Sequence, residues 1–339
     1  MTSIQKMLFC LALLVPINSS FANSADFEKM KSLALNGNAN AQWILGYSYA
    51  NGKDVEQNYS KAIEWYTKAA EQGDMGAQTQ LGLIYVRGKE VEKNYPKAIE
   101  WFNKAAQQGD ENAQYMLGVM YLAGEGAIKK DYTAAVKWLD KAAKQGLPEA
   151  QAELGNAYYT GLGVNKNYIE ALKWFNKAAQ QGNTHAQNEL GLMYDNGHGV
   201  EKSSAKAFEW YKKAADQGSA SGQYNIGILY KNGEGVPQDF NKAFEWFSKA
   251  AEQGHVDAQN NLGVMYNTGQ GTVKNIALSN EWYLKAANNG SAIAQFNIGQ
   301  NYLYGNNGLP ENLTQALNWF KVAAGNGHAQ AKLLLAGLQ

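Results

Sequence analysis

A regularly spaced tryptophan constrains this chain more than any other feature of its sequence. Eight of the nine tryptophans recur at intervals of 36 or 37 residues, which chance placement does not explain. A period of this length indicates an array of small structural units that must stack, because one unit alone cannot bury its apolar face. The recurring residues are Trp65, Trp101, Trp138, Trp174, Trp210, Trp246, Trp282 and Trp319.

The stretch 77–109 shows why each unit is predicted to be a pair of helices. Ala77, Leu81 and Tyr85 are four residues apart, which places them on one face of an α-helix. A second apolar stripe, with steps of three and four residues, surrounds Trp101. A glycine follows each half, where a left-handed residue commonly ends a helix. The sequence therefore predicts a helix–loop–helix hairpin that packs against copies of itself.

The repeated positions each have a predicted packing role. Small residues on the first helix let a neighbouring helix approach closely, and the tyrosine fills the space one turn on. We expect the tryptophan of the second helix to be the large wedge, whose truncation would cost about 3–5 kcal/mol. The alanine pair that follows it is expected to pack the second helix against the next repeat.

Residues 1–22 have the pattern of a secretory signal peptide. A positively charged start precedes an apolar run, Met7 to Val15, and the sequence around Ala22 fits a small-x-small cleavage site. Because the run is too short to span a bilayer, we expect export, with the mature protein in the periplasm or secreted. Cleavage would remove Cys10, the only cysteine, and leave no thiol or disulfide.

The charge balance argues against a nucleic-acid partner. Basic and acidic residues number 30 each, and loss of one lysine with the signal peptide gives 29 − 30 = −1. Nucleic-acid binding requires a basic face, which this balance does not favour. No later apolar segment is long enough to cross a membrane, so we expect no membrane span in the mature chain.

The domain organisation follows from where the repeats start and stop. Residues 23–37 are expected to form an N-terminal capping helix, a degenerate second helix that ends at Gly37. Eight repeats then occupy residues 38–327. The last residues, 328–339, repeat only the start of the unit and are expected to form a closing half-repeat.

The repeated pattern A-x-x-x-L-G-x-x-Y-x-x-G-x-G-V, followed by K-A-x-x-W-(Y/F)-x-K-A-A-x-Q-G, resembles the Sel1-like repeat, a relative of the tetratricopeptide repeat. The resemblance covers about residues 38–338. Departures from it are few: Asp54 and Glu90 replace a loop glycine, Ser279 replaces a second-helix alanine, and Ser204 replaces a loop aromatic residue.

This resemblance implies an all-α, right-handed α-solenoid of about eight repeats that acts as an adaptor or scaffold. Exported bacterial members of the family are associated with host-cell interaction, envelope assembly or signalling, and one type binds secretory immunoglobulin A. The resemblance implies a binding role and does not name the ligand.

Three motifs that resemble catalytic or ligand-binding sites have simpler explanations within the repeat. The G-x-G pairs, such as Gly161 with Gly163, lack the preceding strand and third glycine of a phosphate-binding turn. The histidines are not paired at metal-ligand spacing, so we expect neither a metal nor a cofactor. The four are His185, His198, His255 and His328.

The third motif, Ser203-Ser204-Ala205-Lys206, matches the S-x-x-K of penicillin-recognising enzymes. Some cysteine-rich Sel1-like proteins have been linked to β-lactam binding, so a β-lactam-binding enzyme stands as a remote alternative. No S-D-N or K-T-G motif follows, and Lys206 occupies the ordinary lysine position of the repeat. We therefore expect no enzyme activity and no catalytic residue.

A partner would bind where the first helices line a groove. The positions two and six after the repeated alanine, flanked by those nine and ten after it, are predicted to face that groove. They combine aromatic, aliphatic and amide side chains, which suit an extended segment of a partner protein or peptide. The candidate residues are Trp43, Tyr47, Thr79, Leu83, Arg87, Tyr115, Asn156, Asn188, Tyr224, Asn260 and Phe296.

The sequence thus predicts an exported, monomeric, non-catalytic scaffold for protein–protein interaction. One expectation is host interaction or virulence, with immunoglobulin or a host receptor as the partner. The other is a periplasmic scaffold or regulator in envelope assembly or signalling.

Overall fold

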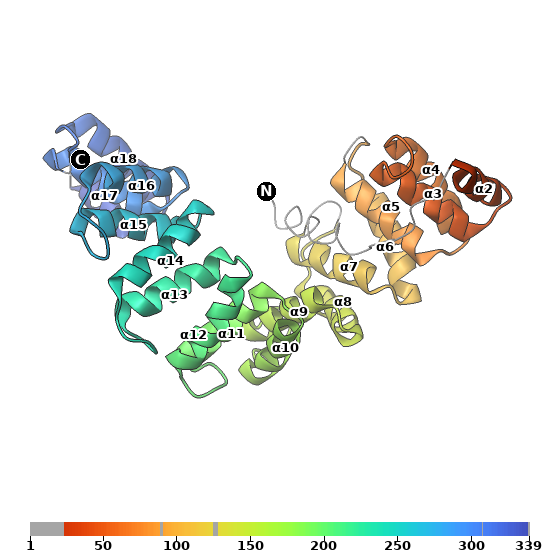
Figure 1. Ribbon diagram of the computed structural model, residues 1–339, viewed down its shortest axis with the longest axis horizontal. Helices are drawn as coiled ribbons and strands as arrows, with labels where there is room; N and C mark the ends of the chain where they lie inside the picture. Colours follow the sequence, from red (N-terminus) through yellow and green to blue (C-terminus); the bar gives the residue numbers. More distant parts are fainter. Residues whose placement is uncertain (1–23, 89–90, 125–127, 307, 338–339) are drawn as a thin grey trace. The chain divides into compact units, whose positions relative to one another are not determined.

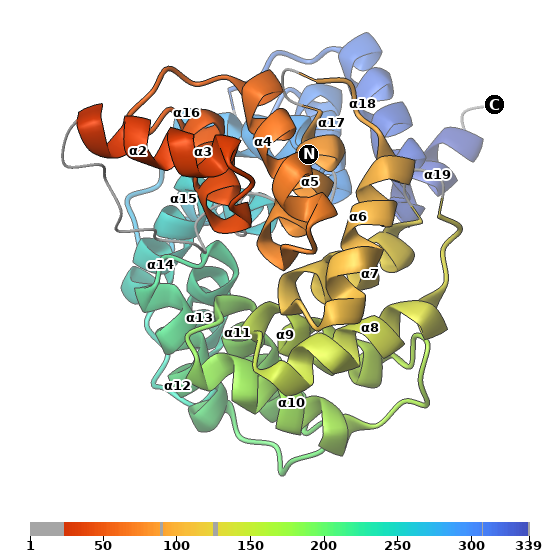
Figure 2. The same ribbon diagram turned by 90° about the vertical axis from the view of Figure 1, so that its right-hand side faces the viewer.

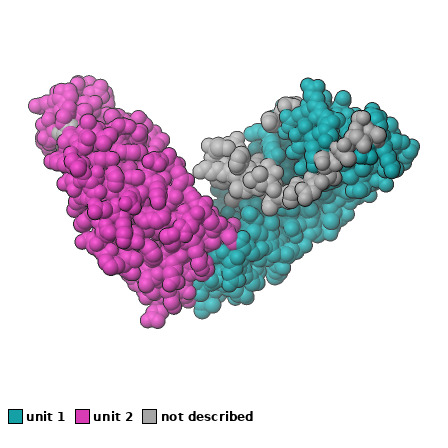
Figure 3. Space-filling view, viewed as in Figure 1, with its two compact units in different colours: residues 1–181 teal, residues 182–339 magenta. Residues whose placement is uncertain are grey.

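The computed structural model describes residues 24–88, 91–124, 128–306 and 308–337. Within these residues the chain forms helices and no strand, which confirms the predicted all-α fold. The predicted signal peptide and Glu90 lie outside the described residues. The chain divides into two compact units, residues 1–181 and 182–339, which are coloured separately in Figure 3.

Unit 1 consists of a single helix followed by four hairpins (Figure 1). In each hairpin the first helix packs against the second, and the second packs against the first helix of the next hairpin. The helices are α2 (Ser24–Leu35), α3 (Ala39–Asn51), α4 (Tyr59–Glu71), α5 (Met75–Arg87), α6 (Tyr95–Gln108), α7 (Glu111–Ala123), α8 (Tyr132–Gln145), α9 (Pro148–Thr160) and α10 (Tyr168–Gln180).

Unit 2 has four hairpins followed by a short helix, and its hairpins stack in chain order (Figure 2). The same alternation of contacts connects its helices from α11 to α19. They are α11 (Thr184–Asn196), α12 (Ser204–Asp216), α13 (Ala220–Asn232), α14 (Phe240–Glu252), α15 (Val256–Thr268), α16 (Ile276–Asn288), α17 (Ala292–Tyr304), α18 (Leu313–Gly325) and α19 (Ala329–Ala336).

Local sequence signals set the start of each helix. From α3 to α19 an Asn, Asp, Ser or His side chain caps the first turn, as when Asn58 Oδ1 accepts from the Lys61 amide at 2.9 Å. Helix α9 is the exception, because Leu147 cannot cap it and Pro148 begins it instead. These caps satisfy amides that a helix cannot pair internally.

The glycines predicted to end the helices do so with left-handed backbone. Those after the first helices and those after the second helices all have positive φ. Asp54, which replaces a second loop glycine, also has a positive φ of 63°. Among the described residues it is the one non-glycine residue in that region, and aspartate tolerates it better than most residues do.

One close contact that recurs in every hairpin joins the first-helix glycine to the side chain that follows the tryptophan. A Cβ on Gly227 would lie 2.6 Å from Phe247 Cε1, closer than two carbons can approach. The same contact recurs in all eight hairpins, where the nearest atom would lie at most 2.7 Å away. The pairs are Gly46–Tyr66, Gly82–Phe102, Gly118–Leu139, Gly155–Phe175, Gly191–Tyr211, Gly227–Phe247, Gly263–Tyr283 and Gly299–Phe320.

In each hairpin the side chain after the tryptophan is therefore buried more deeply than the tryptophan. The sequence had predicted the tryptophan itself as the large wedge. Phe102, Phe175 and Phe247 are completely buried. Most of the tryptophans are only half-buried, and in seven hairpins a lysine three residues later lies 3.9–4.4 Å above the ring centroid. The tryptophan therefore packs at the edge of the hydrophobic core, with a lysine ammonium over its ring. The side chain that follows it fills the centre of the core.

Substituting Gly227 by Ala should destabilise the protein by about 1–3 kcal/mol, because the new Cβ must displace the Phe247 ring. Gly325 is the matched control. It ends helix α18 with open space around its Cβ position, so Gly325→Ala should be neutral or stabilise by up to about 1 kcal/mol. Urea unfolding of the two variants measures the difference, and equal effects would contradict this account of the hairpin.

The hydroxyl of Tyr66 provides a second test of the core. The oxygen is buried without a hydrogen-bond partner among the described residues, and burial raises the pKa of Tyr66. Tyr66→Phe should therefore leave the free energy of unfolding unchanged or raise it, by up to about 3 kcal/mol. The reverse change in the next hairpin, Phe102→Tyr, should lower it, as denaturant titration will show. A clear loss of stability in Tyr66→Phe would mean that the hydroxyl is paired.

Candidate partner-binding surface

The candidate residues lie on the first helices of the hairpins, and they divide into two groups by exposure. Trp43, Tyr47, Arg87, Asn156, Tyr224 and Asn260 are half-buried, so part of each side chain remains accessible. Thr79, Leu83, Tyr115, Asn188 and Phe296 are buried, at 8% exposure or less. Only the first group presents surface to a partner in this conformation.

The position two residues after the repeated alanine packs on the N-cap of the next hairpin. Thr79 Oγ1 donates to Asp110 Oδ1 at 3.1 Å. The Tyr224 ring stacks on His255, with centroids 4.5 Å apart and planes 18° apart. Phe296 stacks on His328 in the same way, at 4.3 Å and 17°. Each pair joins a first helix to the start of the next one, so these side chains also hold the junctions between hairpins.

Amide side chains link the first helices of unit 2. Asn225 Nδ2 donates to Asn188 Oδ1 at 2.8 Å, between α13 and α11. Lys231 Nζ donates to Asn261 Oδ1 at 3.1 Å, between α13 and α15. In contrast, Asn260 Oδ1 has no hydrogen-bond partner among the described residues. This face of unit 2 is therefore polar and mostly pre-organised.

The first helices of unit 1 carry Trp43, Tyr47 and Arg87 of the candidate set. The Trp43 and Tyr47 rings stack with centroids 5.8 Å apart and planes 19° apart. Arg87 is the only arginine in the sequence, and partial burial lowers its pKa while the phenol of Tyr59 opposes that shift. Tryptophan, tyrosine and arginine are the residue types that most often dominate protein interfaces.

A buried array of amide hydrogen bonds accompanies these surfaces, and the sequence pattern had not predicted it. The glutamine directly after the repeated alanine is only 2–7% exposed in every hairpin. Its Oε1 accepts from the amide side chain just before the glycine that ends the second helix. We call this array the amide ladder. Its donor–acceptor pairs are Gln72–Gln42, Gln108–Gln78, Gln145–Gln114, Gln181–Gln151, Gln217–Gln187, Gln253–Gln223, Asn289–Gln259 and Asn326–Gln295.

The ladder glutamines also reach back to the preceding hairpin. Gln78 Nε2 donates to the Ala70 carbonyl at 3.0 Å, and Gln259 Nε2 donates to the Ala251 carbonyl at 3.2 Å. That carbonyl lies in the last turn of a helix and also accepts from the amide of the glycine that ends it, at 3.0 Å for Gly73 and 2.9 Å for Gly254. One side chain thus joins the ends of two successive second helices. The recurring Ala-Gln and Gln-Gly dipeptides were the sequence signal for this array.

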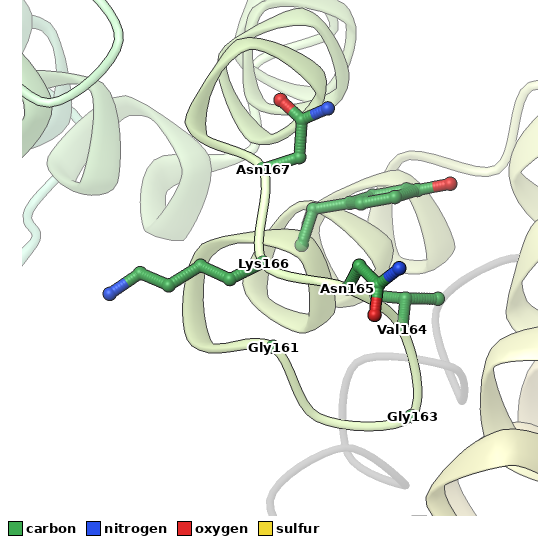
Figure 4. Close-up of a pocket in the computed structure, with 7 residues that line it drawn as sticks. Gly161, Gly163, Val164, Asn165, Lys166 and Asn167 are labelled. Atoms are coloured by element: carbon green, nitrogen blue, oxygen red, sulfur yellow. The ribbon is translucent and has the colours of Figure 1, made fainter.

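The loops hold shallow pockets rather than a phosphate site. One pocket of about 640 Å³ is lined by Tyr158, Gly161, Gly163 and residues 164–167, and Lys166 extends away from Val164 and Asn165 (Figure 4). A Cβ on Gly163 would overlap the Tyr132 carbonyl oxygen of the preceding hairpin. The second glycine of the G-x-G pair is therefore needed for loop packing, which explains the motif without a nucleotide.

Ser203 acts as a helix cap. Its Oγ accepts from the Lys206 backbone amide at 3.3 Å, at the start of α12. Over the described residues there is no group of three or more His, Cys, Asp or Glu side chains arranged to hold a metal ion. In the same residues no helix is both long and apolar enough to cross a bilayer.

Comparison with known families matches all eight hairpins to the Sel1 repeat, over residues 39–74, 76–110, 112–147, 148–183, 184–219, 220–255, 256–291 and 292–328. Two solved structures are similar along most of the chain. One is a protective antigen present in uropathogenic Escherichia coli strains that displays an SLR fold. It is 38% identical with a TM-score of 0.76, and the match covers 92% of this chain and 67% of that one.

The other similar structure is a Sel1 repeat protein from Oxalobacter formigenes. It is 30% identical with a TM-score of 0.72, and the match covers 96% of each chain. A comparison with proteins of curated function found no match.

The protonation of His255, which packs on Tyr224, should make the stability of the protein depend on pH. His255 Nδ1 accepts from the Ala258 amide, and burial lowers the pKa of His255 although Asp257 opposes the shift. Because the pKa of His255 is lower in the folded protein than in the unfolded chain, the neutral imidazole stabilises the folded state at pH values above the unfolded pKa. This stabilisation is lost as the pH falls through the folded pKa.

We therefore expect the free energy of unfolding to decrease between about pH 7 and pH 5, as histidine protonates. His255→Ser keeps a capping oxygen without a titrating ring, so its unfolding free energy should change less over the same range. Denaturant titrations of both proteins across this range make the comparison. Identical pH profiles would show that His255 does not contribute.

Proposed function

Because the chain belongs to the Sel1 repeat family, we propose that it is a scaffold that binds a partner protein through the exposed side chains of its first helices. The observation that carries this proposal is that the repeated residues and the varied residues of each repeat lie in different surroundings. The repeated residues are used for packing, whereas Trp43, Arg87 and Asn156 occupy positions that vary between repeats and remain partly accessible.

The chemistry of these positions supports a protein or peptide ligand. In unit 1 the stacked Trp43 and Tyr47 offer a rigid aromatic surface, and Arg87 offers donors to carbonyl or carboxylate oxygens. In unit 2 the half-exposed Tyr224 and Asn260 combine an aromatic face with an amide. An amide can donate to and accept from the backbone of an extended segment.

The proposed place of action is outside the cytoplasm. The pattern of residues 1–22 supports export, with cleavage near Ala22. The similarity to a protective antigen of uropathogenic Escherichia coli supports host interaction, with an immunoglobulin or a host receptor as the candidate partner. The alternative is a periplasmic scaffold or regulator in envelope assembly or signalling. Recovery of the mature chain in the medium favours the first, and retention in the periplasm favours the second.

A non-catalytic role is part of this proposal. The Ser203 hydroxyl is used as a helix cap, and Lys206 donates its backbone amide to it. These contacts account for the S-x-x-K sequence without a β-lactam-binding role.

The double variant Trp43→Ala/Tyr47→Ala tests the binding surface. It should weaken partner capture by at least about tenfold, because truncation of interface aromatics commonly costs more than 1 kcal/mol each. The measurement is crosslinking of intact cells followed by mass spectrometry, with binding of the identified partner quantified in purified form. Ile169→Ala, at an exposed residue on second helix α10, is the control and should bind as the wild type does. Undiminished capture by a helical, folded double variant would refute the assignment of this surface.

A further inference from the structure

The amide ladder is not chemically uniform along the chain. Six of its donors are glutamines, whereas the donors of its last two pairs are Asn289 and Asn326. Each of these asparagines is followed directly by a glycine, Gly290 and Gly327. The glutamine donors are also followed by glycine, so the eight donor sites differ mainly by one methylene group.

That methylene decides how readily the side chain reacts with its own backbone. In Asn-Gly the glycine nitrogen can close a five-membered ring on the side-chain carbonyl, and the glycine offers no side chain to hinder it. In Gln-Gly the same attack must close a six-membered ring, which forms far more slowly. We propose that Asn289 and Asn326 are sites of spontaneous deamidation, and that this reaction breaks the last two pairs of the amide ladder.

The reaction balances with water as the only co-reactant. The Gly290 nitrogen gives up its proton and bonds to Asn289 Cγ. The Cγ–Nδ2 bond breaks, and ammonia leaves with that proton. Water then adds to one of the two ring carbonyls. The product depends on which ring bond breaks: cleavage at the main-chain carbonyl gives isoaspartate, and cleavage at the side-chain carbonyl gives aspartate. Asn326 and Gly327 react in the same way.

The structure leaves room for this chemistry at both sites. Asn289, Gly290, Asn326 and Gly327 are all exposed. A Cβ placed on either glycine would meet nothing within 4 Å, so the space needed by the ring and by water is open. The Gly290 amide donates to the Ala287 carbonyl at 3.1 Å. This bond belongs to the end of a helix and must open before the nitrogen can attack.

Deamidation would leave the ladder with two acceptors and no donor between them. Gln259 Oε1 now accepts from Asn289 Nδ2 at 3.0 Å, while Gln259 Nε2 donates to the Ala251 carbonyl. A carboxylate at position 289 cannot donate at neutral pH. If Gln259 turned its amide over to donate to that carboxylate, its oxygen would face the Ala251 carbonyl instead. One hydrogen bond of a buried glutamine is lost in either orientation.

The same logic applies to Gln295, which accepts from Asn326 Nδ2 at 2.9 Å and donates to the Ala287 carbonyl at 2.8 Å. The two reactive sites therefore lie at consecutive junctions, between α16 and α17 and between α18 and α19. Deamidation would loosen this end of unit 2 and leave the glutamine pairs of the other hairpins intact.

Peptide mapping by mass spectrometry tests the reactivity. The purified protein is incubated at physiological temperature and mildly alkaline pH, and conversion to aspartate and isoaspartate is followed at each donor. We expect conversion at Asn289 and Asn326 and none at Gln217 or Gln253. The variant Gln217→Asn, which precedes Gly218, should acquire the reaction, and Asn289→Gln should abolish it at that site. No conversion at Asn289 and Asn326, or none at position 217 of the Gln217→Asn variant, would overturn the proposal.

A second measurement tests the structural consequence. Asn289→Asp reproduces the deamidated side chain, and Asn289→Gln restores the donor found in the other hairpins. We expect Asn289→Asp to lower the denaturation midpoint and to speed hydrogen exchange in α15 and α16, which the pair joins, and Asn289→Gln to match the wild type. Equal midpoints and exchange rates in the two variants would show that the ladder pair does not hold this junction.

Discussion

The close approach of a helix glycine to the residue after the tryptophan is the constraint on which the rest of the fold depends. Because Gly82 has no Cβ, the Phe102 ring can lie against the backbone of α5 and fill the hairpin completely. Glycine in a helix interior normally costs stability, by about 0.5–1 kcal/mol relative to alanine. The burial of an aromatic ring, which is worth about 1.5–3 kcal/mol, offsets that cost.

The amide ladder solves the polar side of the same packing problem. Carbonyls in the last turn of each second helix can accept a second hydrogen bond in addition to the one from the terminal glycine, which for the Ala70 carbonyl comes from Gly73. Gln78 supplies this second hydrogen bond to Ala70, and its own oxygen receives one from Gln108. A glutamine is long enough to reach both partners, which explains why this polar side chain is buried next to the regularly spaced alanines.

Much of the hairpin could be predicted from the sequence, because spacing alone places Ala77, Leu81 and Tyr85 on one face. The depth of the side chain after the tryptophan could not, since Trp101 and Phe102 are adjacent and both apolar. The ladder was also hidden, because a glutamine after alanine is indistinguishable from a solvated residue until its partner 30 residues away is known.

The candidate surface shows a similar limit. The helical period placed Tyr224 and Asn188 on the first helices, yet it could not show that Tyr224 stacks on His255 or that Asn188 pairs with Asn225. These contacts depend on how consecutive hairpins meet, which sequence spacing does not encode. Half-buried residues such as Asn156 and Arg87 remain candidates for partner contact.

The ladder has an evolutionary consequence. A ladder glutamine bonds to its own hairpin and to the one before it, as Gln114 does with Gln145 and Ala106. A duplicated segment of one period would therefore bring a complete set of donors and acceptors, and both new junctions would be satisfied without any other change. Unequal recombination between such segments can lengthen or shorten the array in a single step. Because each hairpin supplies its own ladder hydrogen bonds, the number of hairpins can change while the structure of each hairpin stays the same.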